Sequence, residues 1–254
     1  MTLDLLALLV AGLLLATMPV FAFARHRQPG GRPLDPEVAA RPRTALLGFW
    51  VRDWLMWLIA PLERLFLALG IPPVAFNWAG AAFGAAAGFA YASGAFPAAG
   101  WLVLLGGVAD IFDGRIARAR GLVSEAGAFL DSTLDRFAET FAYAGLVVWY
   151  RTSAWGVLMV TLALGGSLLV SYTRARGEGL GVHYKGGLMQ RAERLVLLAL
   201  ASLLDPVAAR FAGVPAGRVL LVTIAFVGLA SLATAFHRTL AIAGALERKG
   251  TPRG

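Results

Sequence analysis

Long blocks of apolar residues restrict this chain to folds that a lipid bilayer can hold. The first block covers residues 3–24. Six further blocks follow at about 75–94, 98–119, 126–150, 153–176, 188–204 and 216–246. A helical run of roughly 20 apolar residues crosses about 30 Å of hydrocarbon while satisfying its own backbone hydrogen bonds. With 58% hydrophobic and 15% charged residues, the chain is expected to be an all-α integral membrane protein.

The N-terminal part differs from the rest in composition. AFA before Arg25 resembles a signal-peptidase site, but no Lys or Arg precedes the apolar block, so we expect a retained helix. Residues 45–70 place three Trp at helical spacing among charged residues, which predicts an interfacial amphipathic helix broken near Pro61. Three parts are therefore expected: an N-terminal transmembrane helix with a basic Pro-rich and Gly-rich linker (1–44), the interfacial helix (45–70) and a six-helix transmembrane domain (71–254).

The distribution of charge predicts an orientation. The net charge is +8, and the basic residues cluster between apolar blocks, which favours contact with anionic lipids over a nucleic-acid partner. Arg151, Arg210 and Arg218 are the basic residues expected at one end of the helices. The other end carries Arg115, Arg118, Arg120, Arg174, Arg176, Lys185, Arg191, Arg194, Arg248, Lys249 and Arg253. This bias predicts an inner-membrane protein whose working face is cytoplasmic and whose N-terminus lies outside.

Four carboxylates in one short stretch, GGVADIFDGRIARARGLVSEAGAFLDSTLDRFAET, predict a metal site. Asp110 and Asp113 share one face of a helix, and Asp131 and Asp135 share a face of the next. A short connection at 120–125 makes the two helices antiparallel neighbours, so all four converge near their cytoplasmic end. Like charges cannot share a low-dielectric site unaided. Carboxylate oxygens without His or Cys favour Mg²⁺, Mn²⁺ or Ca²⁺.

The alternative is that some of these Asp side chains pair with arginine. The candidates nearby in sequence are Arg115, Arg118, Arg120 and Arg136. The absence of cysteine excludes thiolate ligands, thiol nucleophiles and disulfides. Small residues, Gly114, Ala117 and Gly127, lie one turn or less from the carboxylates and leave room for a base or a phosphate. Arg118, one turn after Gly114, could bind such a phosphate.

The stretch D-x-x-D-G-x-x-A-R-x8-G-x3-D-x3-D, from Asp110 to Asp135, resembles the signature of the CDP-alcohol phosphotransferase (CDP-alcohol phosphatidyltransferase) family. The resemblance covers about residues 70–246 and implies six spanning helices. It implies that Asp110, Asp113 and Asp131 bind two divalent cations, Mg²⁺ or Mn²⁺, and that Asp135 completes the metal site and acts as general base. It also implies a CDP-binding set: Gly114, Ala117, Arg118 and Gly127.

One segment departs from the family pattern. Where relatives carry Pro-Asn-x-x-Thr at the start of the first core helix, this chain reads Pro73-Val74-Ala75-Phe76-Asn77. Val74 and Asn77 therefore occupy the usual Asn and Thr positions, which puts the nucleotide contacts of this helix in doubt.

A second polar cluster bears on the acceptor. The segments SYTRARGEGLG and QRAERL are similar to those of the branch that uses inositol phosphate, the phosphatidylinositol phosphate synthases. That similarity implies an acceptor-phosphate pocket built from Ser171, Arg174, Arg191 and Arg238. A positive-inside flank is the alternative explanation for the arginines, although apolar residues surround Arg238. Glycerol phosphate is the alternative acceptor.

We therefore expect a membrane enzyme of phospholipid biosynthesis. It would transfer a phosphatidyl group from a CDP-lipid such as CDP-diacylglycerol to a phosphorylated polyol and release CMP. A transporter is the competing class, but no inverted repeat is visible. Gly80, Gly84 and Gly88 recur every four residues, which indicates close helix packing inside one subunit or a contact in the homodimer that we expect.

Overall fold

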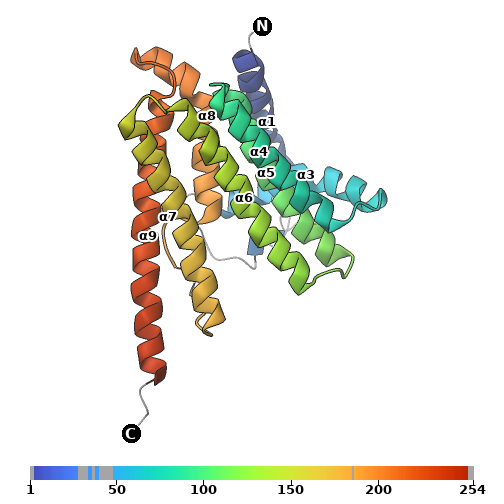
Figure 1. Cartoon of the computed structure of the whole chain (residues 1–254). Coiled ribbons are helices and arrows are strands. Elements are labelled where there is room, and N and C mark those ends of the chain that lie inside the picture. The colour runs from blue at the N-terminus through green and yellow to red at the C-terminus, as the bar shows by residue number, and fades with distance from the viewer. Residues whose placement is uncertain (1–2, 28–33, 36–37, 40–47, 185, 251–254) are drawn as a thin grey trace.

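The computed structural model describes residues 3–27, 34–35, 38–39, 48–184 and 186–250. These residues form helices and turns and contain no strand (Figure 1). The helices are α1 (Leu3–His26), α3 (Phe49–Ala68), α4 (Pro73–Ala92), α5 (Phe96–Ala119), α6 (Glu125–Trp149), α7 (Ala154–Gly179), α8 (Arg191–Ala212) and α9 (Arg218–Gly250). Lys185, Arg253 and most of the linker between α1 and α3 lie outside the described residues.

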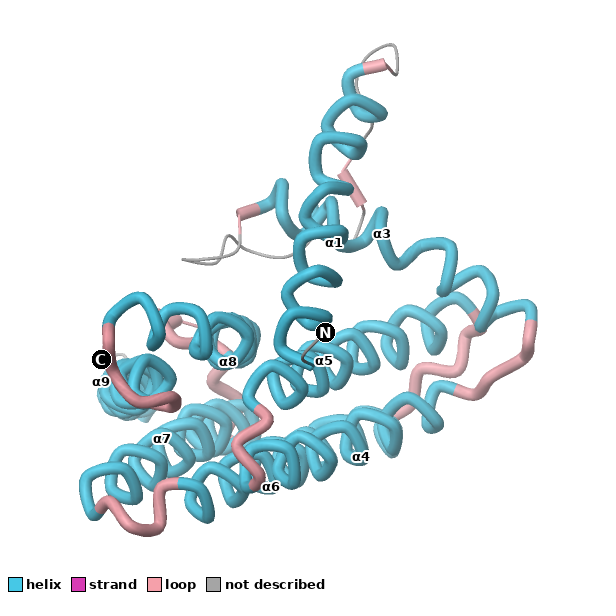
Figure 2. Tube along the Cα trace, turned by 90° about the horizontal axis from the view of Figure 1, so that it is seen from above, coloured by secondary structure: helices cyan, strands magenta, loops and turns pink. Residues whose placement is uncertain are grey.

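The helices α4 to α9 form one bundle. α4 packs against both α5 and α6, α5 packs against α8, and α7 packs along α9. α1 and α3 lie beside α5 on one side of the bundle, as the view from above shows (Figure 2). The bundle therefore places the end of α5 between the N-terminal helices and α6.

Five of the described helices are long and apolar enough to cross a membrane: α1, α5, α7, α8 and α9. α6 is long enough but carries Asp131, Asp135, Arg136 and Glu139. α4 is built mostly from Gly and Ala, whose small side chains add little hydropathy. The all-α integral membrane class expected from the sequence is confirmed.

Small residues let α4 and α6 approach each other closely. A side chain at Gly84 would collide with Ala138 of α6, and one at Gly88 with the carbonyl of Phe141. A side chain at Gly145 of α6 would in turn meet the backbone of Gly88. Gly84 and Gly88 therefore serve close packing within one subunit, which was one of the two explanations offered for the glycine repeat.

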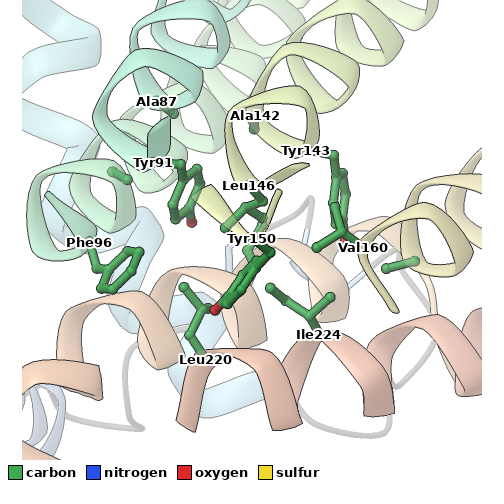
Figure 3. Packing of buried hydrophobic residues seen from close by; sticks show 13 residues of the cluster. Ala87, Tyr91, Phe96, Ala142, Tyr143, Leu146, Tyr150, Val160, Leu220 and Ile224 are labelled. Carbon is green, nitrogen blue, oxygen red and sulfur yellow. The ribbon is translucent and has the colours of Figure 1, made fainter. Parts of the chain in front are cut away.

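A cluster of buried side chains joins the bundle at the end opposite the 120–124 loop (Figure 3). Tyr91 lies in it with its hydroxyl 2.7 Å from the hydroxyl of Ser202. Tyr150 donates to the carbonyl oxygen of Gly217 at 2.5 Å. Because buried tyrosine hydroxyls require partners, these contacts tie the end of α4 to the middle of α8, and the end of α6 to the residue before α9.

Two expectations about helix boundaries were wrong. α3 is not broken near Pro61 but runs through it. Pro61 is exposed, and its missing N–H removes only one hydrogen bond from a helix that side-chain contacts hold at several other points. α8 continues past the expected end at residue 204 and includes Pro206.

The close approach of α4 and α6 gives a stability prediction. Gly145→Val should destabilise the protein by about 2 kcal/mol or more, because the two backbones must separate to admit the side chain. Thermal unfolding in detergent measures the effect. Gly165→Val is the matched control, since a β-carbon added at Gly165 on α7 meets no atom of a neighbouring element within 4 Å. Equal melting temperatures for the two variants would contradict the prediction.

Candidate active site

Two antiparallel helices bring three carboxylates together. Asp110 and Asp113 of α5 and Asp131 of α6 each offer an oxygen, and the three oxygens lie within 4.8 Å of one another. The turn between the helices ends at Ser124, whose hydroxyl oxygen accepts from the Gly127 amide at 3.1 Å and so caps α6. The cap fixes where α6 begins, and with it which residues of α6 face α5.

Asp113 is held by two donors. Its carboxylate accepts from the side-chain amide of Asn77 on α4 at 3.0 Å and from the backbone amide of Gly114 at 2.6 Å. Asp113 and Asn77 are both buried. An ionised carboxylate has about four lone-pair positions, so the two donors fix its orientation and leave positions free for a cation.

Arg191 connects the two carboxylate helices to α8. Its Nη1 lies 2.9 Å from Asp110 Oδ2, and its Nη2 donates to Asp135 Oδ1 at 2.5 Å. Arg136 is a second, more distant partner of Asp135 at 3.7 Å. Of the four arginines proposed above as partners for the Asp residues, Arg136 makes such a pair, and Arg115 is paired with carboxylates elsewhere.

The donor set fits a divalent cation. Asp110, Asp113 and Asp131 are half-buried or buried, and carboxylate oxygens are the ligands that Mg²⁺ and Mn²⁺ prefer. Three such groups within reach of one point repel one another strongly in a low-dielectric setting. A divalent cation held by these three residues would remove that repulsion.

The residues expected to hold CDP lie in the last turns of α5 and the first turn of α6. The guanidinium of Arg118 lies over Gly114, with Nη1 3.1 Å from the position that a β-carbon there would take. Ala117 is half-buried on the same helix, and Gly127 is exposed in the first turn of α6. The glycine at 114 thus provides the space that the Arg118 side chain uses.

The residues expected to bind the acceptor phosphate are less closely gathered. Arg238 is buried in α9 and donates to the carbonyl oxygens of Gly186, at 2.7 Å, and Val170, at 2.9 Å. Arg174 is exposed and pairs with Glu178 at 2.9 Å.

Of this acceptor set, Arg191 contacts the carboxylates. Ser171 is half-buried on α7.

Sequence reasoning missed a buried polar network beneath Asp135. Glu139 lies one turn further along α6, accepts from Arg194 Nε at 3.3 Å and is hydrogen-bonded by the Ser167 hydroxyl of α7. Glu139 and Arg194 line a cavity together with Asp135, Arg191 and Tyr143. The four-residue spacing from Asp135 could have pointed to Glu139. The bond from Asn77 to Asp113 was also missed, because Asn77 drew attention only as a departure from the family pattern.

Comparison with known proteins connects this geometry to a family. Residues 65–235 match the CDP-alcohol phosphatidyltransferase family. A phosphatidylinositol phosphate synthase of Streptomyces avermitilis is 34% identical over 224 residues, which cover 84% of this chain and 87% of that protein. An archaetidylinositol phosphate synthase of Methanothermobacter thermautotrophicus is 40% identical over 118 residues, 46% of this chain and 59% of that protein.

Solved structures agree with the sequence comparison. The Mycobacterium tuberculosis phosphatidylinositol phosphate synthase with CDP-DAG bound has a TM-score of 0.62 and 27% identity, over 72% of this chain and 92% of that chain. The same enzyme in complex with manganese and citrate has a TM-score of 0.63 and 27% identity, over 72% of this chain and 87% of that chain. The matched region contains the four carboxylates and more than half of the sequence. The chain belongs to the CDP-alcohol phosphatidyltransferase family.

Proposed function

We propose that this protein transfers the phosphatidyl group of CDP-diacylglycerol, or of a related CDP-lipid, to a hydroxyl of inositol phosphate and releases CMP. The observation that carries the proposal is the meeting of Asp110, Asp113 and Asp131 within 4.8 Å, one turn from Asp135. The names of the relatives in Streptomyces and Methanothermobacter and the CDP-DAG bound to the mycobacterial structure support the acceptor and the donor.

Different residues would hold the metal ions, accept the proton and bind the CDP portion. Asp110, Asp113 and Asp131 would hold divalent cations, Mg²⁺ or Mn²⁺, which neutralise pyrophosphate charge as CMP leaves. Asp135 would accept the proton of the attacking hydroxyl, whose oxygen forms the new bond to phosphorus as the bond to CMP breaks. The CDP portion would lie against Gly114, Ala117, Arg118 and Gly127.

The acceptor phosphate would be bound by cations from three helices. Arg191 of α8, Arg238 of α9 and Arg174 of α7, with Ser171, make up the proposed pocket. Arg238 and Arg194 are both buried cations. A buried cation such as Arg238, with other guanidinium groups nearby, favours an anionic ligand.

We also infer the arrangement in the membrane. α4 to α9 would form a six-helix transmembrane core (71–254), α1 with its linker an additional crossing (1–44), and α3 an interfacial helix (45–70). The basic residues at the end that carries the 120–124 loop support a cytoplasmic active site in the inner membrane. A homodimer is proposed as well. Gly84 and Gly88 are already covered within the chain, so its contact would use other surfaces.

The metal site is tested by loss of carboxylate ligands. Asp113→Asn should abolish CMP release, and Asn77→Ala should lower it about 10- to 100-fold, because Asn77 orients Asp113 without binding the metal. CMP release is measured from CDP-diacylglycerol with inositol phosphate at varied Mn²⁺. Ser132→Ala, on the exposed side of α6, should behave as wild type. Wild-type activity that survives thorough chelation would rule out the metal mechanism.

The acceptor pocket is tested by kinetics. Arg238→Ala should raise the KM for inositol phosphate about 10- to 100-fold, the loss of roughly 1.5–3 kcal/mol from one charge-assisted hydrogen bond. The KM for the CDP-lipid should change little. Arg210→Ala, exposed at the opposite end of the bundle, is the control. Better use of glycerol phosphate or of free inositol than of inositol phosphate would show that the acceptor is wrong.

Orientation is tested by labelling. The sequence contains no cysteine, so Leu122→Cys and Val214→Cys each introduce a single thiol into an exposed position at opposite ends of the bundle. An impermeant thiol reagent applied to intact cells should label position 214 and spare position 122 until the membrane is opened. The reverse pattern would overturn the proposed topology.

A further inference from the structure

Arg115 belongs to the signature segment but faces away from the carboxylates. It follows Asp110 by five residues and Asp113 by two, which places it on the opposite side of α5. Its Nε donates to Glu63 Oε2 at 2.7 Å, and its Nη1 donates to Asp35 Oδ2 at 3.0 Å. Glu63 and Asp35 both precede residue 65, where the family match begins. The signature helix is therefore held by residues that precede the region matched by the family model.

These polar contacts extend as far as the end of the first helix, α1. The backbone amide of Asp35 donates to Asp53 Oδ1 at 3.0 Å, and Asp53 Oδ2 accepts from Arg25 Nη1 at 2.9 Å. Asp53 is fully buried, and a buried carboxylate is costly unless its partners are in place. A continuous series of polar contacts thus runs from Arg25 of α1, through α3, to Arg115 of α5.

Apolar and backbone contacts reinforce the same region. Phe112 and Ile116, on either side of Arg115, pack with Val38 and Met56 in one buried cluster. The guanidinium of Arg120 donates to the carbonyl oxygens of Leu67 and Ile71 at 2.8 and 3.0 Å. Contacts from described residues before α4 consequently hold the last turns of α5: Asp35, Val38, Met56, Glu63, Leu67 and Ile71.

We propose that Arg115 is a positioning residue, and that the N-terminal segment acts through Asp35 and Glu63 to set the place of the donor-binding turns of α5. The opposite face of these turns carries Asp110, Asp113 and Ala117, and Gly114 lies between the two faces. A displacement of about 1 Å in such a group can cost up to 100-fold in rate. Arginine suits the role because its rigid fork reaches both carboxylates at once, which a lysine ammonium on a flexible stem cannot do as well.

The proposal predicts different effects on the use of the two substrates, the CDP-lipid donor and the acceptor. Most of the proposed donor contacts lie on α5, whereas the proposed acceptor residues lie on α7, α8 and α9, and Arg191 among them contacts α5 through Asp110. Removing the contacts of Arg115 with Asp35 and Glu63 should therefore weaken the use of CDP-lipid and leave the use of acceptor almost unchanged. The proposal rests on the donor site proposed above and is independent of which phosphorylated polyol is the acceptor.

Four variants of the full-length protein test it: Glu63→Gln, Arg115→Gln, Arg115→Lys and the double variant Glu63→Gln/Arg115→Gln. The KM for CDP-diacylglycerol should rise about 10- to 100-fold in each, with the KM for the acceptor within about twofold of wild type. The double variant should be no worse than Arg115→Gln alone, because the two residues act through one contact. Arg64→Gln is the matched control. Arg64 neighbours Glu63 on α3, is exposed and donates to the Ala60 carbonyl of its own helix.

Direct binding of CDP-diacylglycerol, measured without acceptor, and melting temperature complete the test. Wild-type KM values in the four variants would overturn the proposal. So would a lowered melting temperature with equal losses for both substrates, since that indicates a general brace. If Arg115→Gln does not fold, Asp35→Asn, which keeps side-chain volume, must show the donor-specific effect. Wild-type protein that binds CDP-diacylglycerol but does not use inositol phosphate would contradict the proposed acceptor and leave this inference standing.

Discussion

Repulsion among Asp110, Asp113, Asp131 and Asp135 is the force that the surrounding structure has to balance. Two neighbouring helices contribute to that balance. α4 supplies the amide of Asn77 to Asp113, and α8 supplies Arg191 to Asp110 and Asp135. These groups are useful only at hydrogen-bonding distance, which explains why the helices around the site approach one another so closely.

The small residues of α4 can be understood in the same terms. Gly84 and Gly88 bring α4 against α6, and Gly80 lies beside Gly106 of α5. Asn77 is one turn from Gly80 on this same helix. Close backbone contact therefore fixes the depth at which the Asn77 amide meets the carboxylate of Asp113. In a bilayer, where lipid tails compete with apolar side chains, such packing of small residues is an effective way to hold two helices at a set distance.

Much of the fold could be predicted from the sequence because hydrophobic length determines where helices lie in a membrane. The carboxylate cluster could be predicted because its spacing is local, within two helices and one short turn. Arg191 could not be assigned to Asp135, because the contact joins residues 56 positions apart and depends on how α8 packs. The break expected at Pro61 was wrong because a local rule about proline was outweighed by the tertiary contacts of α3.

The order of the helices along the chain has a consequence for how the protein is made. α5 and α6, with all four aspartates, leave the ribosome before α8, which carries Arg191. Asp35, Asp53 and Glu63 emerge earlier still, so the support for the outer face of α5 exists when that helix is inserted. The newly inserted pair has its carboxylates in place while their arginine has yet to be synthesised. Arg136, which α6 itself carries 3.7 Å from Asp135, is the counter-charge already present at that stage, and Arg191 joins Asp110 and Asp135 only once α8 has been inserted.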